Sequence, residues 1–538
     1  MATRFKKNNI RALTLLNHTK FLMNVALACF ISSFILSPAI ANQQLVFTVN
    51  AFSIEGDNPL GEKAQEVVAK FIGEHNGMDG LYEAKQALEN KLADEGYTFY
   101  RVTLPPQTLE NGIVKFNVSS FKVTQAIVEG NTFFSDNNIR ASLPTLLPGN
   151  APELDDLSNQ LALANMNAAK STTLSFKMGE QPQTLTAVLN VKDINPQSYF
   201  VLLNNAGTQE TALSRLSVGY QNNNLFNKDH SMTVTYTTSP EELSDINQFG
   251  LSYQLPLYEH GASLSFLVSA SSVESGSVAN NIEVKGSGNV IAMTYIRPLK
   301  RGKNYRHNVN FGLNYKLYKN DITQSGIPIG SDVNSSPVKL AYDGTLTYPT
   351  NGFGFHIDFE ANIAGGTNNE DADYDAVREG ATADWSTLHY AMNYSRRFSN
   401  RGLFIARFKG QQSSDALISG EQFGVGGANS VRAYEERSVL GDTGNEFSLE
   451  YLSQPFTSLQ FKLLAFTDYA KVQLNNVQPG SEDTSDISSV GLGLRWSHER
   501  NMAFKLDAGY ALDDALLGTT SEIKNGDIKA HASFLYRF

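Results

Sequence analysis

A long run of period-two alternation in the second half of the chain constrains the fold most. From about residue 198 onward, apolar residues recur at every second position over segments of about nine to eleven residues. In residues 353–363, for example, apolar side chains alternate with Gly354, His356, Asp358, Glu360 and Asn362. Alternation places the two sets on opposite faces of a sheet, and the set that includes charges must face water. The pattern predicts sheets with one apolar face and one wet face.

Strand length distinguishes a soluble β-sandwich from a transmembrane barrel. Sandwich strands usually run about five or six residues, whereas a strand that crosses a bilayer needs about nine to eleven. Tyrosine and phenylalanine gather near the strand ends, as in an aromatic girdle. The last strand carries Phe534, Tyr536 and Phe538 on one face, which resembles the assembly signal of bacterial outer-membrane barrels. We predict an antiparallel transmembrane β-barrel of about sixteen strands over residues 198–538.

The connections between these strands differ in length. Short ones, such as Leu257–Gly261 and Pro298–Lys303, are expected to be periplasmic turns. Long polar ones, such as Gly365–Glu379 and Gln473–Ser489, are expected outside the cell. We interpret the acidic run at Asp371, Asp373 and Asp375 as part of a solvated outer loop. It matches the start of a calcium loop but has Ala376 and Thr382 where that loop has glycine and glutamate.

The first residues read as a secretory signal peptide. A basic region is followed by the apolar stretch Phe21–Leu36 and by a small-residue cleavage site at Ala39-Ile40-Ala41. We therefore predict that residues 1–41 are removed. The chain has one cysteine, Cys29, inside this leader. A lipoprotein site at Cys29 is the weaker alternative, because the apolar stretch continues past it.

Removal of this leader determines the charge and the thiol content of the mature chain. The leader holds five basic and no acidic residues, so the formal net charge changes from −11 to −16. An acidic chain without a basic stripe argues against nucleic acid as a partner. Without a thiol, the mature chain has neither disulfides nor a cysteine metal site. The histidines form no metal-ligand spacing, and the sequence has no nucleophile elbow and no phosphate-binding loop. We therefore predict no enzyme activity, no metal and no cofactor.

Between the leader and the barrel, the pattern mixes strands with helices. In residues 46–119 it predicts the order β-α-α-β-β, with a strand at Val46–Ile54, a helix at Lys63–Ile72 and a second helix that Asp79 caps and Gly96 ends. The expected buried face of the second helix is formed by Leu81, Ala84, Leu88 and Leu92.

Residues 120–195 repeat that order. Lys122–Val128 is a predicted strand, Ser135 caps a short helix that ends near Leu143, and Leu154–Ala168 is a longer helix before two strands. The first strands of the two modules also end alike, in Ile54-Glu55-Gly56-Asp57 and Val128-Glu129-Gly130-Asn131. Two modules of the same order predict an internal repeat. Both resemble POTRA domains, so we expect POTRA domain 1 at 46–119 and POTRA domain 2 at 120–195.

The stretch 423–444, FGVGGANSVRAYEERSVLGDTG, interrupts the alternation. It is rich in glycine, which permits tight turns and close backbone approach. An arginine buried at its centre would need a carboxylate partner. The stretch resembles the inward-folded loop of the two-partner secretion transporters (TpsB), also known as the haemolysin and filamentous-haemagglutinin secretion-activation family, within the POTRA-plus-barrel superfamily. The matching residues are Val431, Arg432, Ala433, Tyr434, Gly441, Asp442 and Gly444.

Other stretches extend this resemblance. Asn165-Met166-Asn167, Met178-Gly179-Glu180-Gln181-Pro182, Asn204-Asn205-Ala206-Gly207 and Asn224-Leu225-Phe226 are similar to family segments in the second POTRA domain and at the start of the barrel. The resemblance implies that Arg432 contacts Asp468 of the segment Phe466–Ala470 on the inner wall. We expect this strand to be irregular, so the inward orientation of Asp468 rests on the resemblance.

Two residues depart from the family pattern. Ala433 and Ala470 stand where the family has glycine. If either position requires a positive φ, alanine is strained there. Only Asn42–Leu45 separates the predicted cleavage site from the first strand. We therefore expect no helix that plugs the barrel, and a larger resting conductance than a plugged barrel would have.

The resemblance implies the function and the location. We expect a translocator in the outer membrane of a Gram-negative bacterium, with periplasmic POTRA domains that bind a large unfolded TpsA-type exoprotein, and transport driven by folding of that cargo outside. The barrel assembly machinery, periplasmic chaperones and outer-membrane lipid are the other expected partners. The sequence does not identify the cargo. The alternative is a factor that assembles or inserts other barrels, although such relatives carry three or more POTRA domains. A diffusion porin would need neither the domain pair nor the arginine motif.

Overall fold

The computed structural model describes residues 45–207, 212–243, 246–272, 276–277, 283–284, 287–319, 323–324, 327–328, 331–456, 460–477, 482–499, 501–515 and 523–538. The predicted signal peptide lies outside these residues, as does most of the short segment on which the prediction about a plug helix depends. Among the described residues, no helix is both long enough and apolar enough to cross a bilayer.

The first module is a small sheet covered by two helices. Its elements are β1 (Val46–Val49), β2 (Ala51–Gly56), α1 (Lys63–Ala69), β3 (Gly73–Asn76), α2 (Asp79–Asp94), β4 (Tyr100–Thr103) and β5 (Ile113–Ser120). The strands are ordered β2-β5-β4, and β1 pairs separately with β3. The predicted apolar face of α2 is confirmed, because Leu81, Ala84, Leu88 and Leu92 are all buried in the module core. Asp79 is the first helical residue and does not cap the helix, which corrects the prediction. The short strand β3 was also not predicted.

The second module repeats this arrangement. It consists of β6 (Lys122–Glu129), α3 (Asp136–Ala141), the 3-10 helix η1 (Pro144–Leu146), α4 (Leu154–Ala164), β7 (Lys170–Met178) and β8 (Thr184–Asp193), in the sheet order β6-β8-β7. Ser135 caps α3 as predicted, since its hydroxyl accepts from the Asn138 amide at 3.2 Å. Both predicted helices end earlier than expected. Gly56 is the last residue of β2, and Gly130 directly follows β6. Their φ values are both positive, at 86° and 84°, so the two modules repeat the same backbone conformation at matching positions.

The rest of the chain forms one closed antiparallel barrel. Its segments are β9 (Gln197–Asn204), β10 (Arg215–Leu225), β11 (His230–Thr238), β12 (Gln248–Leu257), β13 (Ala262–Ser271), β16 (Gly288–Pro298), β17 (Tyr305–Tyr318), β20 (Val333–Ser335), β21 (Pro337–Thr347), β22 (Asn351–Asn362), β23 (Ser386–Arg397), β24 (Leu403–Gln412), β27 (Thr443–Leu452), β28 (Lys462–Gln473), β29 (Thr484–His498), β30 (Met502–Ala511) and β31 (Ile528–Arg537). Because β20 and β21 both pair with β17 and only Ser336 separates them, they form one strand. These seventeen segments are therefore sixteen strands.

The alternation of apolar and polar residues in the sequence corresponds to side chains that point alternately to the outer and inner faces of the barrel wall. On β22, the apolar residues Ile357 and Phe359 are exposed on the outer face, whereas Asp358 and Glu360 are buried on the inner face. The last strand, β31, pairs with β9 and closes the barrel. Phe534, Tyr536 and Phe538 are all exposed, and the rings of Tyr536 and Phe538 stack with centroids 5.6 Å apart.

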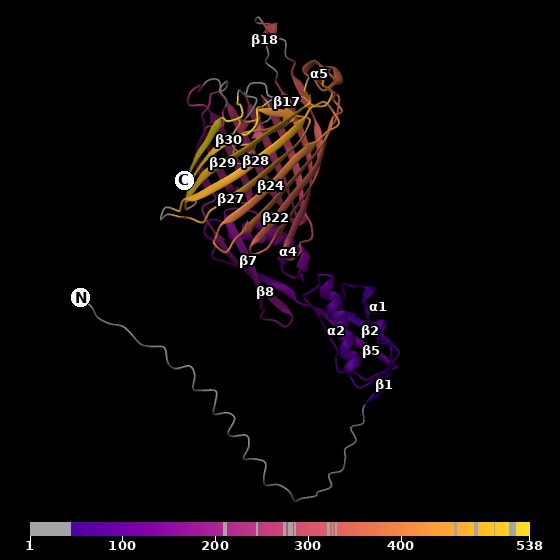
Figure 1. The fold of residues 1–538 in the computed structure, drawn as a ribbon. Helices are drawn as coiled ribbons and strands as arrows, with labels where there is room; N and C mark the ends of the chain where they lie inside the picture. Colours follow the sequence, from indigo (N-terminus) through magenta and orange to yellow (C-terminus); the bar gives the residue numbers. More distant parts are fainter. Residues whose placement is uncertain are drawn as a thin grey trace, which may run out of the picture.

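The two ends of the barrel differ. Figure 1 shows both modules at one end, which we call the module end, and helix α5 (Asp371–Val377) at the opposite, far end. Short turns, including the 3-10 helix η2 (Tyr258–His260), lie at the module end. The acidic run at 371–375 belongs to α5. Asp373 completes a capping box with Glu370, and Asp371 and Asp375 accept backbone amides. The predicted loop at 473–489 is shorter than expected, since β29 begins at Thr484.

Candidate functional site in the barrel lumen

The connection between β24 and β27 folds back into the barrel. Within it, β25 (Phe423–Val425) and β26 (Val439–Gly441) pair as a hairpin. Val431, Ala433 and Tyr434 at its tip are fully buried and pack against Ala470, Val472, Ile487 and Ala511 of the wall. The Tyr434 hydroxyl donates to the carbonyl oxygen of Asp513 at 2.7 Å. We call residues 413–442 the inward loop.

Arg432, at the tip of the inward loop, donates hydrogen bonds to several acceptors on the barrel wall. Its Nε and Nη2 donate to Oδ2 and Oδ1 of Asp468 at 2.8 and 2.6 Å, and its Nη1 donates to Glu450 Oε1 at 2.7 Å. The Arg432 backbone amide donates to Asp468 as well, at 3.2 Å. The guanidinium carbon lies 3.6 Å from the centroid of the Phe466 ring. Bidentate, charge-assisted bonds of this kind fix both position and orientation.

Because the contact is buried, removal of either Arg432 or Asp468 alone is costly. Arg432 and Asp468 are 3% and 1% exposed. Ser448 and Ser489 also donate to Asp468, at 2.8 and 3.2 Å, so its oxygens have several partners. Loss of one member of such a pair leaves the other charge buried without compensation, at a cost of about 3–5 kcal/mol.

The structure answers two questions from the sequence: whether the strand at Asp468 is irregular, and whether Ala433 and Ala470 are strained. Phe466, Asp468 and Ala470 lie on the same inward face of a regular strand, so the expected irregularity is wrong and residues two apart simply share a face. Neither Ala433 nor Ala470 has a positive φ, so neither alanine is strained in the way that the missing glycines suggested.

Close packing at the loop tip instead depends on Gly509 of β30. A Cβ at this position would lie 2.8 Å from the Ala433 nitrogen and from the Arg432 carbonyl carbon and oxygen. Contacts this short with backbone atoms force the backbone to move. Gly509→Ala is therefore expected to displace the loop tip and raise the single-channel conductance in planar bilayers. Gly312→Ala is the matched control, since its Cβ would meet only side-chain atoms, of Lys339 at 3.3 Å and of Thr294 at 3.8 Å. Equal conductance of both variants and wild type would contradict this packing argument.

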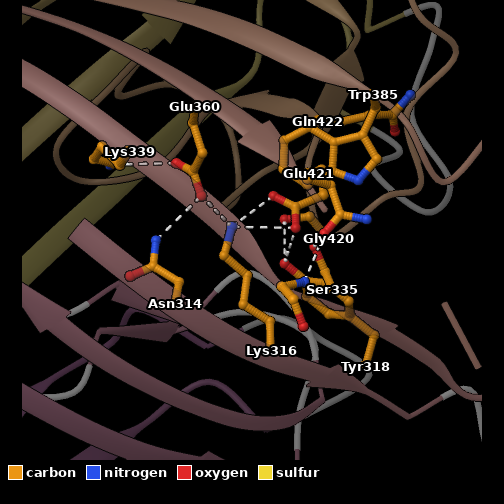
Figure 2. A network of polar contacts seen from close by, with 12 residues as sticks. Asn314, Lys316, Tyr318, Ser335, Lys339, Glu360, Trp385, Gly420, Glu421 and Gln422 are labelled. Carbon is orange, nitrogen blue, oxygen red and sulfur yellow. Dashed lines mark hydrogen bonds and ion pairs between the residues drawn. The ribbon is translucent and has the colours of Figure 1, made fainter. Parts of the chain in front are cut away.

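A second ion-pair network binds the part of the inward loop that precedes β25 (Figure 2). Lys316 of β17 lies between Glu360 of the wall and Glu421 of the loop, at 2.9 and 2.8 Å. The Tyr318 hydroxyl donates to Glu421 at 2.9 Å, and the Lys316 ammonium also lies 5.6 Å from the Trp385 ring centroid. The loop is therefore attached to a second part of the wall, formed by β17 and β22, in addition to the contact of Arg432 with β27 and β28.

Asp442 anchors the end of the inward loop. Its carboxylate binds both Nη atoms of Arg378, at 2.5 and 2.8 Å. It also accepts the backbone amides of Leu417 and Asn475, at 3.0 and 2.6 Å. Arg378 follows helix α5, so this contact joins the far-end connection to the inward loop. Gly441 ends β26, and Gly444 lies in β27.

The sequence predicted Arg432 and Asp468 but missed the other anchors. Glu450, Lys316 and Glu421 carry no motif, and their only signal is inward parity on a strand or charge in a polar loop. The sequence assigned Asp442 to the loop motif without a partner, which the structure identifies as Arg378. A cavity of about 790 Å³ remains in the lumen beside the loop, and Arg432, Glu450, His356 and His389 are among the residues that line it.

A third buried ion pair joins the second module to the barrel. Lys170 of β7 lies 2.5 Å from Asp229 in the turn after β10, and both side chains are almost fully buried. Tyr258 also donates to Asp229, at 2.5 Å. Burial lowers the pKa of Lys170 below its usual value, although Asp229 attracts the charged form.

Polar contacts surround this pair and bring together two stretches that the sequence singled out. Asn167 donates to the Asn223 carbonyl oxygen at 2.6 Å, and Asn138 donates to that of Asn227 at 2.9 Å. We call Lys170, Asp229 and these contacts the module–barrel junction.

Comparisons with known proteins agree with this architecture. Residues 186–496, more than half of the chain, match the family described as haemolysin secretion/activation protein ShlB/FhaC/HecB. Residues 47–120 match the family described as POTRA domain, ShlB-type. The Heme/hemopexin transporter protein HuxB of Haemophilus influenzae (strain 86-028NP) is 19% identical over 88% of this chain and 85% of its own length.

Solved structures show the same fold. CdiB from Escherichia coli aligns with a TM-score of 0.69 and 16% identity, over 94% of this chain and 93% of that chain. CdiB from Acinetobacter baumannii aligns with a TM-score of 0.66 and 16% identity, over 92% and 90% of the two chains. This chain therefore belongs to the ShlB/FhaC/HecB family of haemolysin secretion/activation proteins, the outer-membrane translocators of two-partner secretion, whose POTRA domains lie in the periplasm.

Proposed function

We propose that this translocator exports one large, unfolded exoprotein of the TpsA type and that the inward loop narrows the pore at rest. The observation that carries the proposal is the attachment of this loop to two separate parts of the wall, through Arg432 with Asp468 and through Glu421 with Lys316. A polypeptide needs free cross-section in the lumen, so the loop must shift during passage. Ion pairs suit this role, because a passing chain can replace their partners one at a time.

The POTRA domains provide the capture step in this proposal. The edge strands β2 and β4 of the first sheet, and β6 and β7 of the second, are arranged so that an extended client can add a strand. Main-chain pairing is tolerant of client sequence, which suits an unfolded cargo. The step requires no catalytic group. Folding of the cargo outside the cell supplies the direction, and the barrel assembly machinery with periplasmic chaperones delivers the translocator to the membrane.

The alternative, a barrel-assembly factor, fits this chain less well. In the part of the chain that the structure describes, two POTRA-like modules precede the barrel, whereas three or more are expected of an assembly factor. The anchored loop favours a pore that is narrowed between export events.

The proposal expects a large exported protein to be encoded beside this gene, and its export is the test. We expect the protein to appear outside the cell in the wild type and to be degraded in the periplasm of a deletion strain, with recovery on complementation. The levels of other outer-membrane barrels are the control and should not change. A general loss of barrels in the deletion strain would instead support the assembly role, and unaltered export would contradict the proposal.

A further inference from the structure

A patch of histidines and carboxylates lies on the lumen wall, away from the Arg432 contact. His356, Asp358 and Glu360 occupy alternate positions of β22 and share its inward face. Asp343 of β21 lies directly opposite His356, and His389 of β23 lies opposite Asp358. One ligand atom each from Asp358, Glu360 and His389 lies within 4.8 Å of the others. We call these five residues the histidine–carboxylate patch.

Each imidazole ring is oriented by a hydrogen-bond partner on one of its two nitrogens. His356 Nδ1 lies 2.6 Å from Asp343, and its Nε2 lies 2.6 Å from Asp358. His389 Nε2 lies 3.0 Å from the side-chain oxygen of Gln411, and its Nδ1 lies 3.0 Å from Asp358. Gln411 donates its own amide to two backbone carbonyls, so its oxygen must face His389. Outer partners of this kind orient metal-binding histidines in proteins.

Neutral imidazoles would leave this arrangement unsatisfied. Since Gln411 takes the Nε2 proton of His389, a neutral His389 points the lone pair of Nδ1 at a carboxylate oxygen of Asp358. A neutral His356 likewise faces Asp343 or Asp358 with a lone pair, because both carboxylates accept and only one proton is present. Each contact therefore requires either a second proton on the ring or a metal ion that binds the nitrogen and the oxygen after the two have moved apart, since Zn–N and Zn–O bonds are about 2.0–2.2 Å long.

The balance of charges around the patch also indicates that protons or a cation are missing when both imidazoles are neutral. Asp343, Asp358, Glu360 and the neighbouring Glu421 carry four negative charges, and Lys316 and Lys339 carry two positive charges. With neutral imidazoles the group has an excess of two negative charges. Two imidazole protons or one divalent cation would balance it.

Two further observations point to a ligand. Thr387 lies opposite Glu360, is 2% exposed, and has no hydrogen-bond partner for its hydroxyl among the described residues. The patch is also accessible, since His356, Asp358 and His389 line the lumen cavity. A mixed set of imidazole nitrogens and carboxylate oxygens suits Zn²⁺ and related transition metal ions better than Mg²⁺ or Ca²⁺.

We propose that the histidine–carboxylate patch is a site for a divalent transition metal ion of the Zn²⁺ type. Asp358, Glu360 and His389 are the ligands, and His356, Asp343 and Gln411 are positioning residues. Lys339, whose ammonium lies 3.6 Å from Asp358 and 3.3 Å from Glu360, competes with the ion. Its side chain is one-third exposed and can turn into the lumen. This site is independent of the proposed export function.

The test is equilibrium dialysis of the full-length, tag-free protein in detergent against Zn²⁺, with Co²⁺ absorption to report nitrogen and oxygen ligation. We expect one equivalent of metal in the wild type. His389→Gln and His356→Gln are expected to weaken binding at least about tenfold, and Asp343→Asn about 10–100-fold. Lys339→Met is expected to strengthen it, because it removes the competing cation.

His307→Gln is the matched control, since His307 shares the outward face of β17 with Phe311 and should leave binding unchanged. Heat-modifiable migration in gels shows which variants have folded barrels, and Asp343→Asn retains both imidazoles if a histidine variant does not fold. Absence of stoichiometric metal in the wild type, or equal binding by wild type, Asp343→Asn and Lys339→Met, would overturn the proposal.

Discussion

Arg432→Ala is expected to release the inward loop and reduce export while the barrel still assembles, because a loop without a fixed position obstructs the lumen through which the cargo passes. The substitution leaves Asp468 buried without its cation, whereas Glu450 keeps a second partner in Arg407 at 2.8 Å. The cost of about 3–5 kcal/mol falls on the docked loop. It would lower the ratio of docked to released loop roughly a hundredfold to a few thousandfold, at about 1.4 kcal/mol per factor of ten. The measurement is export of the exoprotein together with labelling of Val431→Cys, which is fully buried in the docked loop.

The controls separate loop release from general damage. Arg407→Ala removes another lumen arginine that also binds Glu450, but its side chain is half exposed, so we expect little labelling at position 431. Asp468→Ala should resemble Arg432→Ala, and the double variant should be less unstable than either single variant because no buried charge is left alone. Normal export and a protected Val431→Cys in folded Arg432→Ala barrels would refute the idea that this contact holds the loop.

Lys170→Met is expected to loosen the module–barrel junction by a similar amount. Asp229 would remain buried with Tyr258 as its donor but without a cation, at a cost of about 3–5 kcal/mol. Spin labels at Lys177→Cys on the second module and Lys303→Cys on a barrel turn would report the loss of a single geometry as a broadened distance distribution. We expect a narrow distribution in the wild type and a broad one in Lys170→Met.

The same junction offers a matched control. Lys300 also bridges barrel and module, to Asp155 at 2.7 Å, but these side chains are 73% and 49% exposed. Exposed pairs contribute about 0–1 kcal/mol, so Lys300→Met should leave the distribution narrow. If both variants broadened it equally, burial of the Lys170–Asp229 pair would not be what fixes the junction.

The repeat and the barrel could be read from the sequence because their signals are local. Alternation places Ile357 and Asp358 on opposite faces of β22, and the helical stripe from Leu81 to Leu92 predicts the buried face of α2. Element ends were less predictable. Asp79 begins α2 without capping it, and the strand β3 carries no periodic pattern, because short pairings depend on neighbours in space rather than on spacing in the chain.

In the candidate site, too, residues with a local motif were predictable, and residues defined only by their neighbours in space were not. Arg432 and Asp468 were predicted from their motifs, although the strand irregularity expected at Asp468 was wrong. The partners Glu450, Lys316 and Arg378 could not be predicted, and neither could the role of Gly509.

The sequence by itself determined the family, the order of modules and barrel, the face on which each strand residue lies and the residue at the loop tip. Only the tertiary structure decided which charges meet across the lumen and at the junction. Lys316 and Glu421 are separated by 105 positions, and Lys170 and Asp229 by 59. Such contacts exist only after the barrel has closed with one register and the loop has folded into it. The physical reason is that periodicity fixes the direction of a side chain, whereas pairing across a lumen depends on strand number, register and closure, which no local pattern records.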